Sequence, residues 1–188
     1  MKKIEQLREK IYDHFHGSTS CANYFFDGSH SDEYATYYTT MYLLQDSIEG
    51  LSEHRNKGFN TNELLAYIEI WGVLQAVIIQ QDSIKTLYEV LTQNKISIPQ
   101  NSNWKEIRTF RNLCGGHPVD KGRPGKRERA FMGRGFGTYD NLLIEVWNEA
   151  KGKTEFREID LGKLIDEYAA EAVKYLQDII TILPTKWP

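Results

Sequence analysis

"NELLAYIEIWGVLQAVIIQQDSIKTLYEVL", residues 62–91, is a long helical pattern that decides the architecture of this chain. A helix with a wide apolar surface packs in the middle of a bundle. Here the apolar residues recur at three- and four-residue steps and cover more than half of the circumference: Leu64, Ile68, Trp71, Leu74, Val77, Ile78, Ile84, Leu87, Tyr88 and Leu91. The preceding stretch offers Asn60 or Thr61 as the N-cap, with Glu63 close behind.

Polar side chains interrupt this apolar surface at Gln75, Gln80, Gln81 and Asp82. Buried polar groups need hydrogen-bond partners. We therefore expect these four side chains to face either a polar pocket or a second subunit, and the pattern leaves both alternatives open.

Four further helical patterns surround this one. They cover residues 2–15, a segment beginning at Ser31 and apolar on one face as far as Leu51, residues 103–114, and residues 162–183, where Pro184 is expected to close the helix. The segment from Ser31 is rich in tyrosine, and we expect its tyrosines to lie in the core, not to form a platform for stacking bases.

A β-hairpin is predicted for residues 138–160, just before the last helix. Leu142, Ile144 and Val146 alternate with more polar residues, and a Lys-Gly-Lys turn leads into a second alternating run. The whole chain, 1–188, is thus expected to be one mainly α domain. It is a bundle of four to five helices with a small β-hairpin inserted before the C-terminal helix.

Composition favours a cytoplasmic protein. Hydrophobic residues make up 40% of the 188 residues and charged residues 26%, as in soluble globular domains. Cys21 and Cys114 lie far apart, so neither a disulfide framework nor a structural zinc site is expected. The charged N-terminus lacks the apolar run of a signal peptide. The stretch 67–79 is too short and too polar to span a bilayer, so no membrane association is expected.

No metal or cofactor is expected either. His14, His16 and His30 lack the spacing of a zinc site. The glycines of 133–137 lack the strand and helix that surround a dinucleotide-binding loop. Cys114 has no recognisable catalytic partners and is expected to be a small buried residue.

One segment has a charge opposite to that of the rest of the chain. Nine Lys/Arg stand against three Asp/Glu between positions 105 and 134, a local +6, so the remainder of this −3 chain carries −9. A basic segment on an acidic body can steer a polyanion such as RNA to one place; the alternative is a solvated loop. Its candidate RNA-binding residues are Lys121, Arg123, Lys126, Arg127, Arg129 and Arg134.

Arg111 and Arg108 are not equivalent on their helix. Each residue advances about 100° around the helix axis. With Trp104 at zero, Ile107 lies at about 300°, Arg111 at about 340° and Arg108 at about 40°. Arg111 therefore lies on the apolar arc and Arg108 off it. An arginine so placed either pairs with an acid, such as Asp82 or Glu89, or opens onto a site that holds an anion.

His117 follows Arg111 after a double glycine and stands before Pro118. Glycine adopts dihedral angles that other residues avoid, and proline disfavours the helical conformation in the residue before it. We expect the helix to break here, which lets the imidazole turn back toward Arg111. The alternative is a histidine that caps the helix end.

The segment "RNLCGGHP", residues 111–118, resembles the R-x(4–6)-H motif of the HEPN superfamily, with Arg111, the polar Asn112 and His117 at the matching positions. HEPN domains are helical bundles of prokaryotic toxins and defence systems, in which this motif lies at a helix end. The resemblance implies metal-independent RNA cleavage by attack of a ribose 2′-hydroxyl. Arg111 and His117 would carry the chemistry, and Asn112 would position the phosphate or the imidazole.

The resemblance also implies a homodimer in which both motifs face one cleft, and an antitoxin or another protein as a further partner. Many members of the superfamily bind without cutting. The alternative function is therefore a non-catalytic helical module that binds nucleic acid, a nucleotide or a protein.

Overall fold

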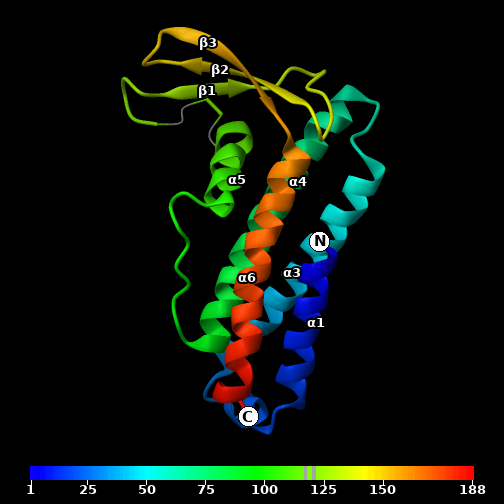
Figure 1. Ribbon diagram of the computed structural model, residues 1–188, viewed down its shortest axis with the longest axis vertical. Helices are drawn as coiled ribbons and strands as arrows, with labels where there is room; N and C mark the ends of the chain where they lie inside the picture. Colours follow the sequence, from blue (N-terminus) through cyan, green and yellow to red (C-terminus); the bar gives the residue numbers. More distant parts are fainter. Residues whose placement is uncertain (117, 120–121) are drawn as a thin grey trace.

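The computed structural model describes residues 1–116, 118–119 and 122–188, and it confirms a mainly α fold with a small sheet before the last helix (Figure 1). The α-helices of this described part are α1 Lys2–Gly17, α2 Thr19–Phe25, α3 Ser31–Lys57, α4 Glu63–Thr92, α5 Asn103–Arg111 and α6 Leu161–Lys186. A π-helical turn, Asn112–Gly116, follows α5, and the strands are β1 Glu128–Phe131, β2 Leu142–Asn148 and β3 Lys153–Ile159. In addition to the four to five helices expected from the sequence, there is a short helix, α2, which buries Cys21 and Phe25.

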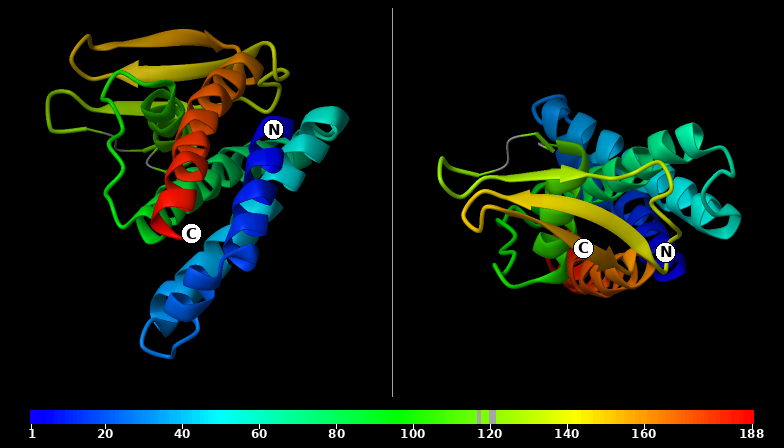
Figure 2. Two further views of the ribbon diagram at one scale, coloured as in Figure 1. Left: turned by 60° about the horizontal axis from the view of Figure 1, so that its bottom comes forward. Right: turned by 90° about the horizontal axis from the view of Figure 1, so that it is seen from above.

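The long helices form an elongated bundle, and the sheet lies across one end of it, beside α5 and the start of α6 (Figures 1 and 2). α4 contacts α3, α5 and α6, while α1 contacts α3 and α6. Fully buried residues such as Ile70, Leu74, Ile84 and Leu87 of α4 belong to one core cluster with residues of all these helices. The central place predicted for residues 62–91 is therefore confirmed for most of its length.

The first turns of α4 depart from that prediction. Leu64, Ile68 and Trp71 were expected in the core, but they are 55%, 62% and 42% exposed. Gly115 of the π-helical turn lies against Trp71, while Leu64 and Ile68 stay open on this side of the helix. Apolar periodicity shows which side of a helix favours burial, but it does not show whether the same chain supplies the cover. By length and composition α4 also qualifies as a membrane span, although 39% of its apolar window is buried within the fold.

The buried glutamines of α4 form hydrogen bonds inside the chain, except that Gln80 Oε1 has no partner among the described residues. Gln81 Nε2 donates a hydrogen bond to the carbonyl oxygen of Trp104 at 2.9 Å, and Gln81 Oε1 accepts one from Arg108 Nη1 at 3.3 Å. Gln80 Nε2 lies 3.5 Å from Ser47 Oγ. The polar positions of α4 thus join it to α5 and α3 instead of lining one common pocket.

Helix ends are set by capping side chains. The N-cap of α4 is Asn62, whose Oδ1 accepts from the backbone N–H groups of Leu64 and Leu65, and not Asn60 or Thr61 as predicted. The N-cap of α5 is Ser102, whose hydroxyl accepts from the backbone N–H of Lys105. α6 does not stop at Pro184 but continues to Lys186. A proline in the final turn removes one backbone donor, and so few turns follow that the helix can tolerate the loss.

The hairpin predicted for residues 138–160 is confirmed as β2 and β3, which pair antiparallel from Leu142↔Ile159 to Asn148↔Lys153. Gly152, with φ +61°, occupies the left-handed position of their turn. The sheet has a third strand, because β1 pairs with the other edge of β2. The prediction of one loop from 121 to 134 is therefore wrong for 128–131, where four residues are too few to show an alternating pattern.

Candidate functional site

Arg111 is the last residue of α5, and its guanidinium is held by two neutral amides. Nη1 donates to Asn112 Oδ1 at 3.1 Å, and Nη2 donates to Gln75 Oε1 of α4 at 2.6 Å. Arg111 and Asn112 are both half-buried. Amide oxygens orient a guanidinium without neutralising its charge. The structure thus brings together two of the three predicted catalytic residues and adds Gln75, which the sequence singled out only as an unexplained polar position.

Arg108 has a different environment from Arg111. Its Nη1 lies 2.7 Å from Asp82 Oδ1, and its Nη2 donates to Asp82 Oδ2 at 3.3 Å. The acid considered as a partner for Arg111 is therefore taken by Arg108. Glu89, the other acid considered, forms no ion pair with Arg111 either, and within the described part of the chain no carboxylate does. The charge of Arg111 is thus oriented, but not neutralised, by the described residues around it.

The break predicted at the double glycine is not found, because both glycines belong to a helical turn. α5 ends at Arg111, three residues earlier than expected, and the chain continues through Gly115 and Gly116 as a π-helical turn. A Cβ atom added at Gly116 would lie 2.8 Å from Arg111 Nη1, whereas one at Gly115 would lie 3.4 Å from Trp71 Cδ1. Gly116 therefore leaves room for the guanidinium against the backbone. π-helical turns of this kind frequently occur at functional sites.

Two of the predicted site residues, His117 and Lys121, lie outside the described residues. The other basic residues do not form one loop. Arg123 and Lys126 are exposed on the loop before β1, Arg129 is in β1, and Arg134 is exposed beyond it. Arg134 lines a hollow of about 680 Å³ at the junction of α3 and α4. The positive charges are thus spread along one edge of the sheet and past its end.

The sheet turns one face away from the helices (Figure 2), and exposed aromatic side chains lie on that outer face. Phe131 and Phe156 stand on either side of Glu145 in the strand register and are 61% and 70% exposed. Trp147, opposite Arg129, is also exposed. The inner face of β2 is instead buried against the core. The sequence pattern of β2 showed which of its faces is apolar, but the neighbours on this outer face depend on the strand pairing.

An exposed apolar stripe on α4 runs up to the Arg111 site. We call Leu64, Ile68, Trp71 and Gly72 the α4 stripe; Gln75, the partner of Arg111, continues it along the helix. A Cβ atom added at Gly72 would meet nothing within 4 Å. Glycine inside a helix costs about 0.5–1 kcal/mol relative to alanine. Gly72 therefore leaves the surface of α4 without a side chain at this level.

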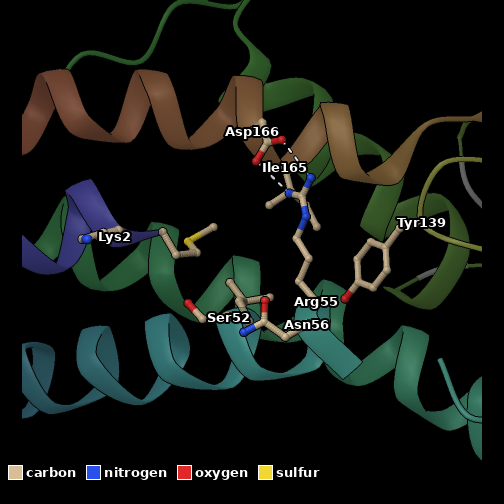
Figure 3. Close-up of a pocket in the computed structure, with 9 residues that line it drawn as sticks. Lys2, Ser52, Arg55, Asn56, Tyr139, Ile165 and Asp166 are labelled. Atoms are coloured by element: carbon tan, nitrogen blue, oxygen red, sulfur yellow. Dashed lines mark hydrogen bonds and ion pairs between the residues drawn. The ribbon is translucent and has the colours of Figure 1, made fainter. Parts of the chain in front are cut away.

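A second hollow, of about 310 Å³, lies between α3 and α6 (Figure 3). Arg55 crosses it and forms a two-pronged ion pair with Asp166, at 2.7 and 2.8 Å, and its Nη1 also donates to the carbonyl oxygen of Gly162 at 3.2 Å. The pair joins the end of α3 to the start of α6. Because the Arg55 charge is satisfied within the chain, this hollow is a weaker anion site than Arg111.

Next to this hollow, His54 joins α3 to α4 and the loop before β2. Its Nδ1 lies 2.7 Å from the Tyr139 hydroxyl, and its Nε2 lies 3.5 Å from Glu69 Oε2. Burial raises the pKa of Tyr139 to about 12, so its hydroxyl keeps its proton and shares a hydrogen bond with Nδ1 whose direction is set by the imidazole tautomer. No pattern in the sequence predicts this group, because its members are far apart in the chain.

No family model, no curated protein and no solved structure matches this chain. The chemistry of its side chains is therefore the basis for assigning a function.

Proposed function

We propose that this chain is a HEPN-like, metal-independent endoribonuclease of the defence or toxin–antitoxin type, which acts in the cytoplasm as a homodimer. One observation carries the proposal. Arg111 is a half-buried cation at a helix end, six positions before His117, and two neutral amides orient it while the nearby acid pairs with Arg108. Such a guanidinium is suited to clamp a phosphodiester and to stabilise the charge that builds on it.

The reaction needs only groups that the chain supplies. The ribose 2′-hydroxyl gives its proton to a base, and its oxygen attacks the adjacent phosphorus. The bond from phosphorus to the 5′-oxygen breaks, and that oxygen takes up a proton. The products are a 2′,3′-cyclic phosphate and a 5′-hydroxyl. We assign the proton transfers to His117, since imidazole titrates near neutral pH, and the phosphate contact to Arg111 with Asn112.

The proposed dimer forms through the α4 stripe. Exposed Leu64, Ile68 and Trp71 supply apolar area, and Gly72 lets the two helices approach closely. Because Gln75 continues the stripe and binds Arg111, two stripes packed against each other would place both arginines beside the shared surface. This arrangement supports one cleft with two sets of catalytic groups.

RNA would reach the cleft along the sheet. Arg123, Lys126 and Arg129 supply positive charge, and Phe131 and Phe156 supply rings on which single-stranded bases can stack. Glu145, between the two rings, repels phosphate, so the phosphate chain would follow the β1 edge where the cations are.

The test is to incubate the protein with end-labelled RNA in EDTA. The proposal predicts fragments that end in a 2′,3′-cyclic phosphate. No cleavage, with binding that weakens as salt rises, would instead support the non-catalytic module. Activity that is lost in EDTA would exclude the metal-free mechanism.

The basic segment is expected to set the salt dependence of RNA binding. Replacing two cations, Arg127→Ala with Arg129→Ala, should weaken binding and reduce the slope of log K against log salt by about 1.4, since each lost contact to a single strand contributes about 0.7. The matched control is Lys3→Ala with Lys10→Ala, two exposed cations on α1. An equal slope in the two double variants would exclude this role.

Gly116→Ala is expected to displace the Arg111 guanidinium, because its Cβ would lie 2.8 Å from Nη1 and 3.2 Å from Asn112 Oδ1. The cleavage rate should fall about tenfold to a hundredfold, as it does when a catalytic group is misplaced by about 1 Å. The free energy of unfolding should change by less than about 1 kcal/mol, since the end of a flexible side chain can move.

The control for this change is Gly115→Ala, whose Cβ meets Trp71 only at an ordinary 3.4 Å. Single-turnover cleavage and urea unfolding should be measured on both variants. Equal cleavage rates in both would show that the room at Gly116 does not position the arginine.

A further inference from the structure

A hollow of about 390 Å³ lies between α5, the sheet and the start of α6, three elements that Figure 1 shows side by side. It is separate from the residues assigned to RNA cleavage. Arg111 and Asn112 do not line it, whereas their neighbours Phe110 and Leu113 do. Arg111 instead reaches α4, where it binds Gln75. The helix α5 thus presents one side to α4 and another side to this hollow.

The floor of the hollow is apolar. It is formed from α5, β2, β3 and α6 by Phe110, Leu113, Ile144, Ile159 and Leu164. Most of their surface is buried in the core, but Phe110 and Leu164 are each 7% exposed and Ile159 is half-buried. The volume lies within the range of small-molecule sites. The floor therefore suits the apolar body of a small ligand.

The lining of the hollow is also acidic. Five carboxylates stand against two cations, which gives a net charge of −3: Glu106, Glu128, Glu158, Asp160 and Glu167 against Arg157 and Lys163. Both cations already have acidic partners, because Arg157 Nη2 lies 2.7 Å from Glu128 Oε1 and Lys163 Nζ lies 3.8 Å from a Glu167 oxygen.

Two of the five carboxylates have no cationic partner. Glu106 and Glu158 are exposed, and across residues 1–116, 118–119 and 122–188 no cation forms an ion pair with either. Asp160 has a structural role instead, since its Oδ1 caps α6 by accepting from the backbone N–H of Lys163 at 2.7 Å. The excess negative charge of the hollow favours a cationic ligand.

The carboxylates do not converge on a single point. Mg²⁺ and Ca²⁺ bind where several oxygen ligands meet. Among the described residues there is no group of three or more histidine, cysteine, aspartate or glutamate side chains that could hold a metal ion. Glu106 and Glu158 also come from different walls, α5 and β3. A ligand that reaches both must carry separate positive charges on an extended body.

We propose that this hollow binds a linear aliphatic polyamine, with ammonium groups on Glu106 and Glu158 and the methylene chain on the apolar floor. An ammonium group donates charge-assisted hydrogen bonds to a carboxylate, and methylene groups gain free energy when they leave water. This ligand class combines the separate charges and the apolar body that the lining calls for.

The test titrates the full chain by calorimetry at low salt with three probes: spermine, diaminooctane and diaminobutane. The two diamines carry an amino group at each end and differ only in apolar length. Spermine should bind with a Kd below about 1 mM. Diaminooctane should bind at least about threefold more tightly than diaminobutane, because its longer chain covers more of the floor.

Glu106→Gln with Glu158→Gln removes the two carboxylates that lack a partner. Spermine binding should weaken at least about tenfold. The urea midpoint should stay unchanged, because both side chains are exposed. The matched control is Glu9→Gln with Glu53→Gln, two exposed glutamates outside the hollow, which should keep spermine binding within about twofold.

Equal weakening in the two double variants would overturn the proposal, because it would show a general attraction between a polycation and an acidic chain. Equal affinity for the two diamines would overturn it as well, since the apolar floor would then take no part. Mg²⁺ binding that is lost in the Glu106 and Glu158 variant would assign these carboxylates to a metal ion instead. None of these measurements involves RNA cleavage, so a failure here leaves the proposed function in place.

Discussion

Arg111→Ala is expected to lower the rate of RNA cleavage by about 10²–10³-fold, the loss typical when a group that stabilises transition-state charge is removed. Within the described chain no acid pairs with the guanidinium, and the proposed function assigns its charge to the phosphate of the substrate. His117→Ala should cost about 10²–10⁴-fold, as expected for a general acid or base. Single-turnover cleavage of a labelled RNA in EDTA measures both effects.

The matched control is Arg108→Ala, which removes an arginine from the same helix. This variant should keep cleavage within a few-fold, and it should lose about 1–3 kcal/mol of stability, because it also removes the hydrogen bond to Oε1 of the buried Gln81. Equal losses in the two arginine variants would contradict the distinction between them. They would point to general loss of positive charge on α5.

Ile68→Glu is expected to weaken the dimer about a hundredfold or more and to reduce cleavage at protein concentrations where the parent is dimeric. Ile68 is 62% exposed on the α4 stripe, and two-fold symmetry would place two new carboxylates in one apolar contact. Burying unpaired charge there would cost about 3 kcal/mol or more. Sedimentation equilibrium gives the dissociation constant.

Leu43→Glu is the control for this prediction, because Leu43 is an exposed leucine on α3, outside the stripe. It should leave the association unchanged. A parent protein that stays monomeric at all concentrations would contradict the dimer through α4 but would leave the catalytic assignment to Arg111 in place.

Local patterns in the sequence predicted the parts of the fold that depend on neighbouring residues. The helical periodicity of α4 and the alternation of Leu142, Ile144 and Val146 gave the central helix and the β2–β3 hairpin. β1 could not be found in the same way. It consists of four residues whose place is decided by pairing with β2, a contact between distant segments.

The candidate site shows the same limit. Angular position on a helix separated Arg111 from Arg108, and the structure confirms that their environments differ. It also offered Asp82 as one alternative partner of Arg111, but Asp82 pairs with Arg108, because periodicity does not show which acid of α4 lies at which level. The π-helical turn was missed, since two glycines permit a wide turn as readily as a break.

Exposure was the least predictable property. The apolar residues of α4 and the tyrosines of α3 follow helical spacing, yet Ile68, Trp71, Tyr38 and Tyr42 are exposed. The same apolar pattern on a helix can face a core, a second subunit or a ligand. Which of these applies depends on elements elsewhere in the chain or outside it.

Chemical rescue tests the proposed role of Arg111 most directly. The rate of RNA cleavage by Arg111→Ala should be measured in EDTA with increasing millimolar guanidinium, well below denaturing concentrations. If a guanidinium beside Gly116 acts on the phosphate, the cleavage rate of Arg111→Ala rises with added guanidinium and saturates. The cleavage rate of His117→Ala shows no such rise. A rate that stays flat in Arg111→Ala, or that equals the parent rate without any guanidinium, would contradict the proposed role of Arg111.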